Sequence, residues 1–453
     1  MDALTNVDGG NPNGGLVISG NVLYGTTWEG GSNGNGTLYS IQTDTSNFAI
    51  LHTFSLPYVT TLSLTNSDGS KPHQTLALAG NVLYGTTSQG GPGGYGTVFK
   101  VNTDGRGFTN LHYFTLGTDG INPQAGLLVS NDTVYGTTSF GGTGGGGTVF
   151  KVNTDGTGYK TLHNFGSSPN DGAGPNGPLV LADGVLYGTA AGGGGASGSG
   201  VVFAVGTNGA GYTNVYVFTG RTTPGTISTN TSGETPCGGL VLAGNTLYGC
   251  TTEGQTNGTG LVFSVHTDGT GYTNLHVFSF ADSQTTNTNS DGANPICTLL
   301  LSGSALYGTA SGGGTNGLGT VFAVNTNGAG FTNLYTFANI VTFIPTFENI
   351  GGAGPAAGLV LSSNILYGTT DNGGFAEGNV FALSLPSSAA LPSPVPLSIQ
   401  GLPGSIVLSW TGTGFSLQST SSLEVPFTNV PGAVSPYPVS TTNTQRFFRL
   451  VKN

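Results

Sequence analysis

The stretch Gly238–Ser279, GGLVLAGNTLYGCTTEGQTNGTGLVFSVHTDGTGYTNLHVFS, is the unit from which most of this 453-residue chain is built. Its Tyr-Gly core recurs in seven copies that are spaced 51 to 61 residues apart. The tyrosines of the successive copies are Tyr24, Tyr84, Tyr135, Tyr187, Tyr248, Tyr307 and Tyr367. A repeat of this length is typical of a propeller or of another repeat array.

One copy contains four strand signals, which we name A to D. Strand A is the apolar run that ends at Gly244, and strand B restarts after Gly244-Asn245. Strand C alternates apolar and polar residues, and the turn Thr-Asp-Gly-Thr-Gly leads into strand D, YTNLHVFS. Four antiparallel strands per copy, without helical periodicity, predict an all-β fold, and seven copies predict a seven-bladed β-propeller.

The two ends of the repeat array predict how the ring closes. The seventh copy runs through strand C, Gly378–Leu383, and then continues into Pro-Ser-rich sequence without an equivalent of strand D. The first copy is preceded by Ala3–Val7, where a strand D would end. We expect this N-terminal segment to be the outer strand of the last blade, because closure removes the free edge of an open array. A linear solenoid would instead need polar caps.

The motif GGL(V/I)L-x-G-N-x-LYGTT-x-x-GG…G-x-G-TVF-x-VNTDG-x-GYTNLHxF resembles the Gloeo/Verruco ("GloVer") tandem repeat of bacterial secreted and surface proteins. The resemblance covers all seven copies, from residue 1 to about residue 385. It implies an extracellular or cell-surface propeller. It implies no catalytic residue, because the family is defined by its repeats.

Composition fits this interpretation and narrows the partners. The 82 glycines and the 6% of charged residues fit a large, turn-rich β protein. A net charge of -11 argues against nucleic acid or an anionic membrane as a partner and favours a neutral ligand. No apolar run is long enough to cross a bilayer, and the absence of a basic-apolar leader at Met1-Asp2 fits a mature or trimmed form.

Three cysteines lie near strand ends in the fifth and sixth copies: Cys237, Cys250 and Cys297. Pairing strands A and B about Gly244-Asn245 sets Cys250 opposite Gly239, two residues from Cys237 and on the same face. A strained Cys237–Cys250 disulfide is therefore one option, and at least one cysteine stays unpaired.

Several residue types repeat with the blades and are therefore interpreted as structural. Four histidines share one strand D position: His52, His112, His163 and His276. We interpret them as packing or surface residues, and the repeated tyrosines and strand C aromatics as the core between blades. An Asp-Gly step before strand A recurs at Asp8, Asp68, Asp119, Asp171 and Asp291. These carboxylates could form a weak calcium site, but calcium takes six to eight oxygen ligands and each loop offers only one charge. An Asx turn is therefore favoured, and no cofactor is expected.

Loop length predicts which face carries the function. The A–B and C–D turns are short in every copy, whereas the B–C loops and D–A loops on the other face vary and reach their greatest length at 55–74, 219–236, 279–295 and 338–356. Binding residues usually lie on such loops. The non-repeating residues there include Trp28, Glu29, Asp371 and Asn372 of the neighbouring blades 1 and 7, with Phe343, Phe347, Glu348, Phe375 and Glu377 nearby and Tyr58, Lys71 and His73 on the connection to blade 2.

This group has two interpretations that the sequence leaves open. An aromatic ring beside carboxylates is what a sugar site needs, with Trp28, Glu29, Tyr58, His73, Asp371 and Phe375 as the candidate ligand-binding residues. The alternative is that these are ordinary loop residues beside the closure of the ring.

Catalysis requires a closer pair of carboxylates. Glu29 and Glu253 are equivalent in blades 1 and 5 but lie nearly opposite in the ring, too far apart for glycoside hydrolysis. Glu29 with Asp371 or Glu377 comes from adjacent blades, so these three are the candidate catalytic residues of a glycoside hydrolase. A lyase for acidic glycans is less favoured because this face offers few bases: Lys71, His73 and Arg221.

After Leu385 the composition changes. We expect a propeller over 1–385, a Pro-Ser linker over 386–396 and a small β-sandwich-like module over 397–453 with Trp410 in its core. The module resembles short C-terminal modules of secreted proteins from the same bacterial groups. The preferred function is binding of a neutral polysaccharide or cell-surface ligand by a secreted or surface protein. A glycoside hydrolase and a structural or adhesive protein without a small-ligand site are the alternatives.

Overall fold

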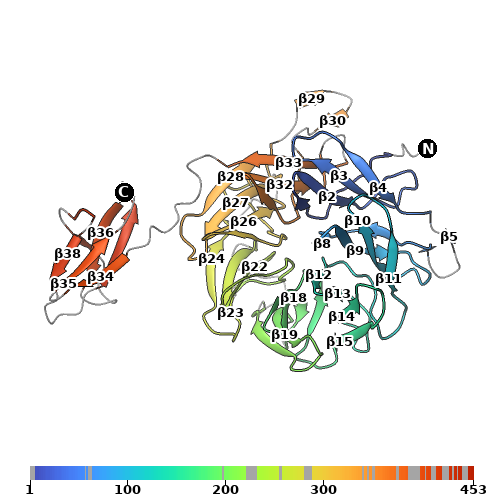
Figure 1. The fold of residues 1–453 in the computed structure, drawn as a ribbon, viewed down its shortest axis with the longest axis horizontal. Coiled ribbons are helices and arrows are strands. Elements are labelled where there is room, and N and C mark those ends of the chain that lie inside the picture. Colours follow the sequence, from blue (N-terminus) through green and yellow to red (C-terminus); the bar gives the residue numbers. More distant parts are fainter. Residues whose placement is uncertain are drawn as a thin grey trace. The chain divides into compact units, whose positions relative to one another are not determined.

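Seven antiparallel sheets arranged around a central axis form the larger part of the computed structural model (Figure 1). The structure describes residues 6–56, 58–59, 64–195, 198–220, 232–254, 258–279, 288–338, 341–343, 346–348, 352–373 and 377–385, and then 398–402, 405–409, 415–420, 428–430, 433–435, 437–440 and 447–452. The chain divides into two compact units, residues 1–385 and 386–453. The predicted all-β, seven-bladed propeller is confirmed.

Blades 1 to 6 have the predicted order A-B-C-D from one edge of the sheet to the other. Blade 1 consists of β1 (Val17–Ser19), β2 (Val22–Thr27), β3 (Thr37–Gln42) and β4 (Ala49–Thr53). Blade 2 consists of β8 (Ala77–Ala79), β9 (Val82–Gln89), β10 (Thr97–Asn102) and β11 (Thr109–Tyr113), and β7 (Ser70–Pro72) also pairs with β9. Blade 3 consists of β12 (Leu128–Ser130), β13 (Thr133–Thr138), β14 (Thr148–Asn153) and β15 (Lys160–Asn164).

The next three blades repeat this order. Blade 4 consists of β17 (Val180–Ala182), β18 (Val185–Gly193), β19 (Val201–Gly206) and β20 (Thr213–Val217), with β16 (Gly172–Pro175) also paired to β18. Blade 5 consists of β21 (Val241–Ala243), β22 (Thr246–Thr251), β23 (Leu261–His266) and β24 (Thr273–Val277). Blade 6 consists of β25 (Leu300–Ser302), β26 (Ala305–Ala310), β27 (Thr320–Asn325) and β28 (Thr332–Thr336).

Blade 7 consists, in the described part of the chain, of three strands: β31 (Val360–Ser362), β32 (Ile365–Thr370) and β33 (Asn379–Ser384). Of the predicted closing segment, residues 3–5 lie outside the described residues. Asn6 and Val7 lead into a turn, and the Asn6 carbonyl accepts hydrogen bonds from the amides of Gly9 (3.2 Å) and Gly31 (2.8 Å). The pairing of residues 3–5 with β33 stays a prediction.

Blades 7 and 1 nevertheless contact each other directly and complete the ring. The Thr369 hydroxyl donates to the Gly14 carbonyl at 3.0 Å, and the Asn11 amide donates to the Glu377 carbonyl at 2.6 Å. Leu16 and Tyr367 belong to one buried cluster across this junction. The ring therefore closes through side-chain packing and loop hydrogen bonds between its ends.

The core lies between neighbouring blades, as the repeated aromatics predicted. Tyr84 of blade 2 packs in one cluster with Phe150 of blade 3, and Phe150 is fully buried. Each such ring stabilises the fold by roughly 1.5–3 kcal/mol relative to an exposed position. The glycine after the repeated tyrosine makes this packing feasible, because a Cβ at Gly136 would lie 2.6 Å from the Phe150 ring.

Strand D is tied to the following loop by a pair that the sequence interpretation missed. The strand D histidines and the loop aspartates, which were assigned separately to packing and to Asx turns, bond to each other. The pairs are His52–Asp68 (3.0 Å), His112–Asp119 (3.2 Å), His163–Asp171 (3.1 Å) and His276–Asp291 (3.0 Å). The Asx-turn interpretation is therefore wrong for these four aspartates, since their carboxylates accept hydrogen bonds from the preceding strand D.

Each of these histidines also stacks on a ring of the next blade. His112 lies parallel to Tyr159 with 3.6 Å between ring centroids, and His276 lies parallel to Phe331 at 3.4 Å. Tyr216 takes the place of the histidine in blade 4, where it stacks on Tyr272. The loop position that holds aspartate elsewhere is there Ser232. In this copy the histidine and the aspartate are both replaced.

The cysteines do not form the Cys237–Cys250 pair that strand register allowed. All three thiols are free, and Cys250 is buried with Cys297 in the cluster between blades 5 and 6. Cys237 lies instead at a pocket on the axis of the ring, with its sulfur 3.9 Å from the Thr252 hydroxyl. The pairing is wrong because Cys250 lies in the blade 5–blade 6 core, whereas Cys237 lines this pocket.

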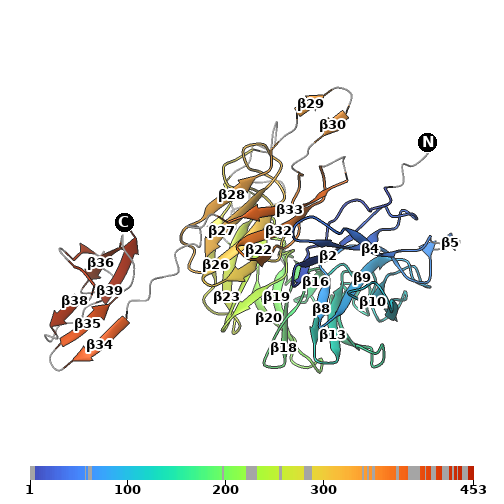
Figure 2. The same ribbon diagram turned by 45° about the horizontal axis from the view of Figure 1, so that its top comes forward.

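Two small hairpins and a second unit complete the structure. The hairpins are β5 (Tyr58–Val59) with β6 (Leu64–Thr65), and β29 (Val341–Phe343) with β30 (Thr346–Glu348), the latter standing apart from the blades in Figure 2. The second unit has two three-stranded sheets: β34 (Ser398–Leu402), β35 (Ser405–Ser409) and β38 (Tyr437–Ser440), and β37 (Thr428–Asn429), β36 (Phe415–Thr420) and β39 (Phe447–Lys452). Leu408 and Leu417 are buried in it, and Trp410 lies outside the described residues. Among the described residues, no helix is long and apolar enough to cross a membrane.

Candidate functional site

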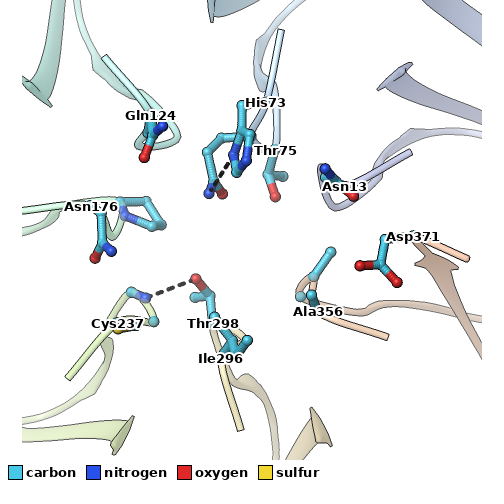
Figure 3. A pocket seen from close by; sticks show the side chains of 16 residues that line it. Asn13, His73, Thr75, Gln124, Asn176, Cys237, Ile296, Thr298, Ala356 and Asp371 are labelled. Carbon is cyan, nitrogen blue, oxygen red and sulfur yellow. Dashed lines mark hydrogen bonds between the residues drawn. The ribbon is translucent and has the colours of Figure 1, made fainter. Parts of the chain in front are cut away.

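A pocket of about 240 Å³ lies on the axis of the ring, and every blade contributes to it (Figure 3). The contributing residues follow the proline that precedes strand A in each copy. They are Asn13, His73, Gln124, Asn176, Cys237, Ile296 and Ala356 in blades 1 to 7. Asp371, directly after β32, also lines the pocket, so it opens on the face where strands A begin and strands B end. This is the face with the variable loops.

The preceding proline fixes the position of each pocket residue. A Cβ added to the B–C loop glycine of one blade would lie 2.5 to 2.9 Å from the proline Cδ of the next blade. Gly36 meets Pro72 in this way, and Gly378 meets Pro12 across the junction of the ring. Because the proline ring fits against the neighbouring blade, the residue that follows it is held at the axial pocket.

The position after the proline changes in polarity around the ring. Blades 1 to 4 place two asparagines, a glutamine and a histidine there, whereas blades 5 to 7 place Cys237, Ile296 and Ala356, and Thr298 and Asp371 add polar groups on that side. The side-chain carbonyl oxygens of Asn13 and Asn176 are buried and accept no hydrogen bond from the described part of the protein. Such acceptors are costly to bury unless a partner reaches them, so they favour a ligand that brings hydrogen-bond donors.

The electrostatics of the pocket favour an uncharged ligand. Burial raises the pKa of Asp371, although the Asn372 amide donates to its carboxylate at 2.8 Å. Burial lowers the pKa of His73, which therefore stays neutral near pH 7. Burial likewise raises the pKa of the Cys237 thiol. Asp371 is thus the one carboxylate among the residues that line the pocket.

A second pocket of about 260 Å³ adjoins the first, because His73 and Gln124 line both. Trp28 and Tyr95 give this pocket two aromatic side chains. The Lys71 ammonium lies 4.5 Å from the centroid of the Trp28 ring and 2.9 Å from Glu29 Oε1. This ammonium holds the indole and the carboxylate together through a cation–π contact and an ion pair.

The structure brings some of the predicted site residues together and separates others. Trp28, Glu29 and His73 gather at blades 1 and 2 around Lys71, and Asp371 reaches the same area across the axial pocket. Glu29 is paired with Lys71, and the Glu377 carboxylate lies against Gly10. Glu29 and Glu377 are not among the residues that line either pocket. Tyr58 is part of the β5–β6 hairpin, and Phe375 lies outside the described residues.

Sequence reasoning missed most of the ring around the axial pocket. It searched for long loops, whereas the ring lies at one fixed position of the repeat, next to an invariant proline. The signal was present: the residue after this proline differs in nearly every copy, while Pro and the following Leu recur at Pro12 and Leu16 and in each later copy. Variation at one position of an otherwise regular repeat marks residues that packing does not dictate.

No described group of three or more His, Cys, Asp or Glu side chains is arranged to hold a metal ion. The described aspartates that repeat before strand A bond to histidines in four blades instead.

The family of the chain follows from its repeats. The model of the Gloeobacter/Verrucomicrobia repeat matches residues 55–230 and 222–391, which together are more than half of the sequence. The chain belongs to this repeat family. The search among curated proteins gave no match.

Several solved structures are similar to this chain at low sequence identity. An oligogalacturonate lyase in complex with manganese is similar at 10% identity, with 81% of this chain and 87% of that chain covered and a TM-score of 0.49. An oligogalacturonate lyase from Vibrio parahaemolyticus is similar at 10% identity, covering 84% and 90% with a TM-score of 0.46. A chain of a nidogen/laminin complex is similar at 12% identity, covering 71% and 92% with a TM-score of 0.40.

Proposed function

We propose that this repeat-family propeller is an extracellular or cell-surface binding protein that recognises neutral glycans at the axial pocket and the adjoining Trp28 pocket. The observation that carries the proposal is the pair of buried side-chain oxygens of Asn13 and Asn176, which lack hydrogen-bond donors among the described residues. A sugar offers many hydroxyl donors and no charge. The extracellular location is supported by the resemblance to repeats of secreted and surface proteins.

The size and chemistry of the two pockets support this class of ligand. Ligand pockets commonly measure about 300–1,000 Å³, so the axial pocket suits a terminal sugar residue better than an internal stretch of chain. Trp28 offers an aromatic surface for the apolar face of a neighbouring sugar ring. The neutral lining, with Asp371 as its carboxylate, disfavours acidic glycans.

A glycoside hydrolase is the second candidate because burial raises the pKa of Asp371, which is the property of a general acid. A hydrolase needs a second carboxylate within about 5–9.5 Å of the first. Glu29 and Glu377, near the junction of blades 7 and 1, are the candidates for this second carboxylate, but Glu29 forms an ion pair with Lys71. Binding without turnover is therefore the preferred function.

The test combines a glycan array with calorimetry on residues 1–385. We expect Trp28→Ala to weaken binding of the best neutral oligosaccharide by about 1–3 kcal/mol, because the ring is a large anchor. Phe140→Ala is the matched control: it removes an exposed aromatic from the same face in blade 3, outside both pockets, and leaves affinity unchanged.

Two polar variants separate binding from catalysis. Asn13→Ala and Asp371→Asn each cost on the order of 1 kcal/mol of affinity in a binding protein, since each removes about one hydrogen bond. In a hydrolase, Asp371→Asn instead keeps affinity and abolishes release of reducing sugar. Saturable binding that is unchanged in Trp28→Ala and Asn13→Ala contradicts the proposed site. A structural or adhesive protein shows no saturable binding on the array.

A further inference from the structure

Two of the three cysteines meet at the interface between blades 5 and 6. Cys250 lies in β22 of blade 5, and Cys297 lies just before β25 of blade 6. The side chains are 0% and 1% exposed and share one apolar cluster. Each thiol shifts the pKa of the other, so the two side chains adjoin. They are 47 positions apart in the sequence, so the fold brings them together.

The repeat shows what normally occupies these two positions. At four other interfaces the position of Cys250 is a threonine, and its hydroxyl donates to the backbone carbonyl at the position of Cys297. The four bonds are Thr86–Ala125 (3.4 Å), Thr189–Gly238 (2.8 Å), Thr309–Ala357 (2.9 Å) and Thr369–Gly14 (3.0 Å). The register of the ring therefore places the side chain at position 250 within contact distance of residue 297.

At the blade 5–blade 6 interface both partners are cysteine, and the threonine–carbonyl bond is lost. We propose that Cys250 and Cys297 form an inter-blade disulfide that links blade 5 covalently to blade 6. Both side chains are buried in one cluster at positions that the register brings into contact, which is a condition for a disulfide between them. In the described part of the chain, no third His, Cys, Asp or Glu gathers with the pair, so a bound metal ion is not favoured. The disulfide is independent of what the axial pocket binds.

The two thiols differ in their surroundings within the folded ring. The Cys250 thiol and the Thr309 amide, which donates to the Cys297 sulfur at 3.1 Å, lower the pKa of Cys297. The same pairing raises the pKa of Cys250.

The oxidant is a small-molecule or protein disulfide, RS–SR. One of the two cysteines, as its thiolate, attacks one sulfur of RS–SR, forms a mixed disulfide and releases RS⁻. The other cysteine, once deprotonated, attacks the sulfur of the first cysteine and releases a second RS⁻, so two thiols are oxidised and one external disulfide is reduced to two thiols. The two protons leave with the two RS⁻ groups. Because both sulfurs are buried in the folded ring, the exchange takes place before blades 5 and 6 dock.

The test is refolding of the full chain with and without oxidised glutathione. The product is alkylated in denaturant, digested without reduction and analysed by mass spectrometry. We expect a Cys250–Cys297 cross-linked peptide and one alkylated cysteine, Cys237. The cross-link closes a loop of about 50 residues in the unfolded chain, so the oxidised protein melts on the order of 5 °C higher than the reduced protein.

The repeat supplies the control variants. Cys250→Thr with Cys297→Ala recreates the pair found at Thr86–Ala125 and Thr309–Ala357, so this protein folds without a difference between oxidised and reduced melting temperatures. Cys237→Ala keeps the full difference. Three alkylated cysteines after oxidative refolding, a Cys237–Cys250 peptide, or a redox-dependent melting temperature that persists in the double variant overturns the proposal.

Discussion

Blades 6 and 7 have the same strands A to C but differ at the outer edge of strand C. In blade 6, β28 pairs with β27, and Phe322 is fully buried. In blade 7, the described residues place no strand beside β33, and its residues alternate between half-buried and exposed. A groove of about 360 Å³, lined by Tyr335, Phe337 and residues 379–383, runs along this edge. The comparison shows that strand D buries strand C.

Two more features of the complete blades change next to blade 7 and at its junction with blade 1. Asp8 occupies the position of Asp291, but it is exposed, and in the described part of the chain no histidine bonds to its carboxylate. Tyr335 of blade 6 occupies the position of His276, yet its one ring contact with a described residue is to Phe337. Strand D therefore has three roles in a complete blade. It pairs with strand C of its own sheet, its histidine bonds to the aspartate of the following loop, and that histidine stacks on a ring of the next blade.

The largest effect is expected where strand D covers strand C. Phe322→Ala should lower the free energy of unfolding by about 3–5 kcal/mol, because it leaves a cavity in a fully buried site. Phe381→Ala, the same change at the equivalent position of blade 7, should cost about half as much, because the ring is already half-exposed. Denaturant unfolding of residues 1–385 measures both. Equal losses would mean that the edge of β33 is covered in solution.

The second prediction compares the loop aspartates. Burial alone would raise the pKa of Asp291, but hydrogen bonds from His276 and from the amide and hydroxyl of Ser279 outweigh it and hold the pKa below its usual range. Asp291→Ala should therefore lower the free energy of unfolding at pH 7 by about 1.5–3 kcal/mol, the range for hydrogen bonds to charged groups. Asp8→Ala should change it by less than about 0.5 kcal/mol.

The pH dependence sharpens the same comparison. A carboxylate whose pKa is lowered by folding stabilises the fold above its unfolded pKa of about 3.9, and this stabilisation is lost as the pH falls through the folded pKa. The stability difference between wild type and Asp291→Ala should shrink below about pH 4. A difference that stays constant down to pH 2 would show that the carboxylate charge does not contribute.

The repeat made most of the fold predictable. Contacts between side chains on either side of a loop could not be predicted from it. Tyr248 and Phe263 recur at fixed positions, so their place in the core follows from the period. The His276–Asp291 pair was missed because the intervening loop varies in length: the two residues are 15 apart here, whereas His112 and Asp119 are 7 apart. Of the candidate site, Trp28, His73 and Asp371 were found as non-repeating loop residues. Asn13 and Asn176 were not, because asparagine is common in these loops.

A smaller effect is expected from the histidines. Burial lowers the pKa of His112, and its hydrogen bond with Asp119 opposes this only in part. A histidine with a lowered folded pKa stabilises the fold above its unfolded pKa of about 6.5, and this contribution is lost as the pH falls toward the folded pKa. The melting temperature of the wild type should decline between pH 7 and pH 5. The melting temperature of His112→Tyr, which places at this position the residue found at Tyr216 in blade 4, should decline less. If the melting temperatures of the two proteins change with pH at the same rate, the pH dependence does not come from His112.

The smallest effect is expected from removing the second unit. Leu385 ends the propeller: its side chain is 5% exposed, its amide donates to the Asn364 carbonyl at 2.9 Å, and its carbonyl accepts from the Asn364 side chain at 2.6 Å. A chain that stops after Leu385 keeps these bonds and should melt within about 1 °C of the full-length protein, because separate compact units usually unfold independently. A chain that stops after Ser384 loses them and should melt lower. If the cut after Leu385 lowers the melting temperature as much as the Phe381→Ala change does, residues 386–453 cover the edge of β33 and blade 7 is not an open blade. If only the cut after Ser384 does so, the exposed edge belongs to the propeller itself.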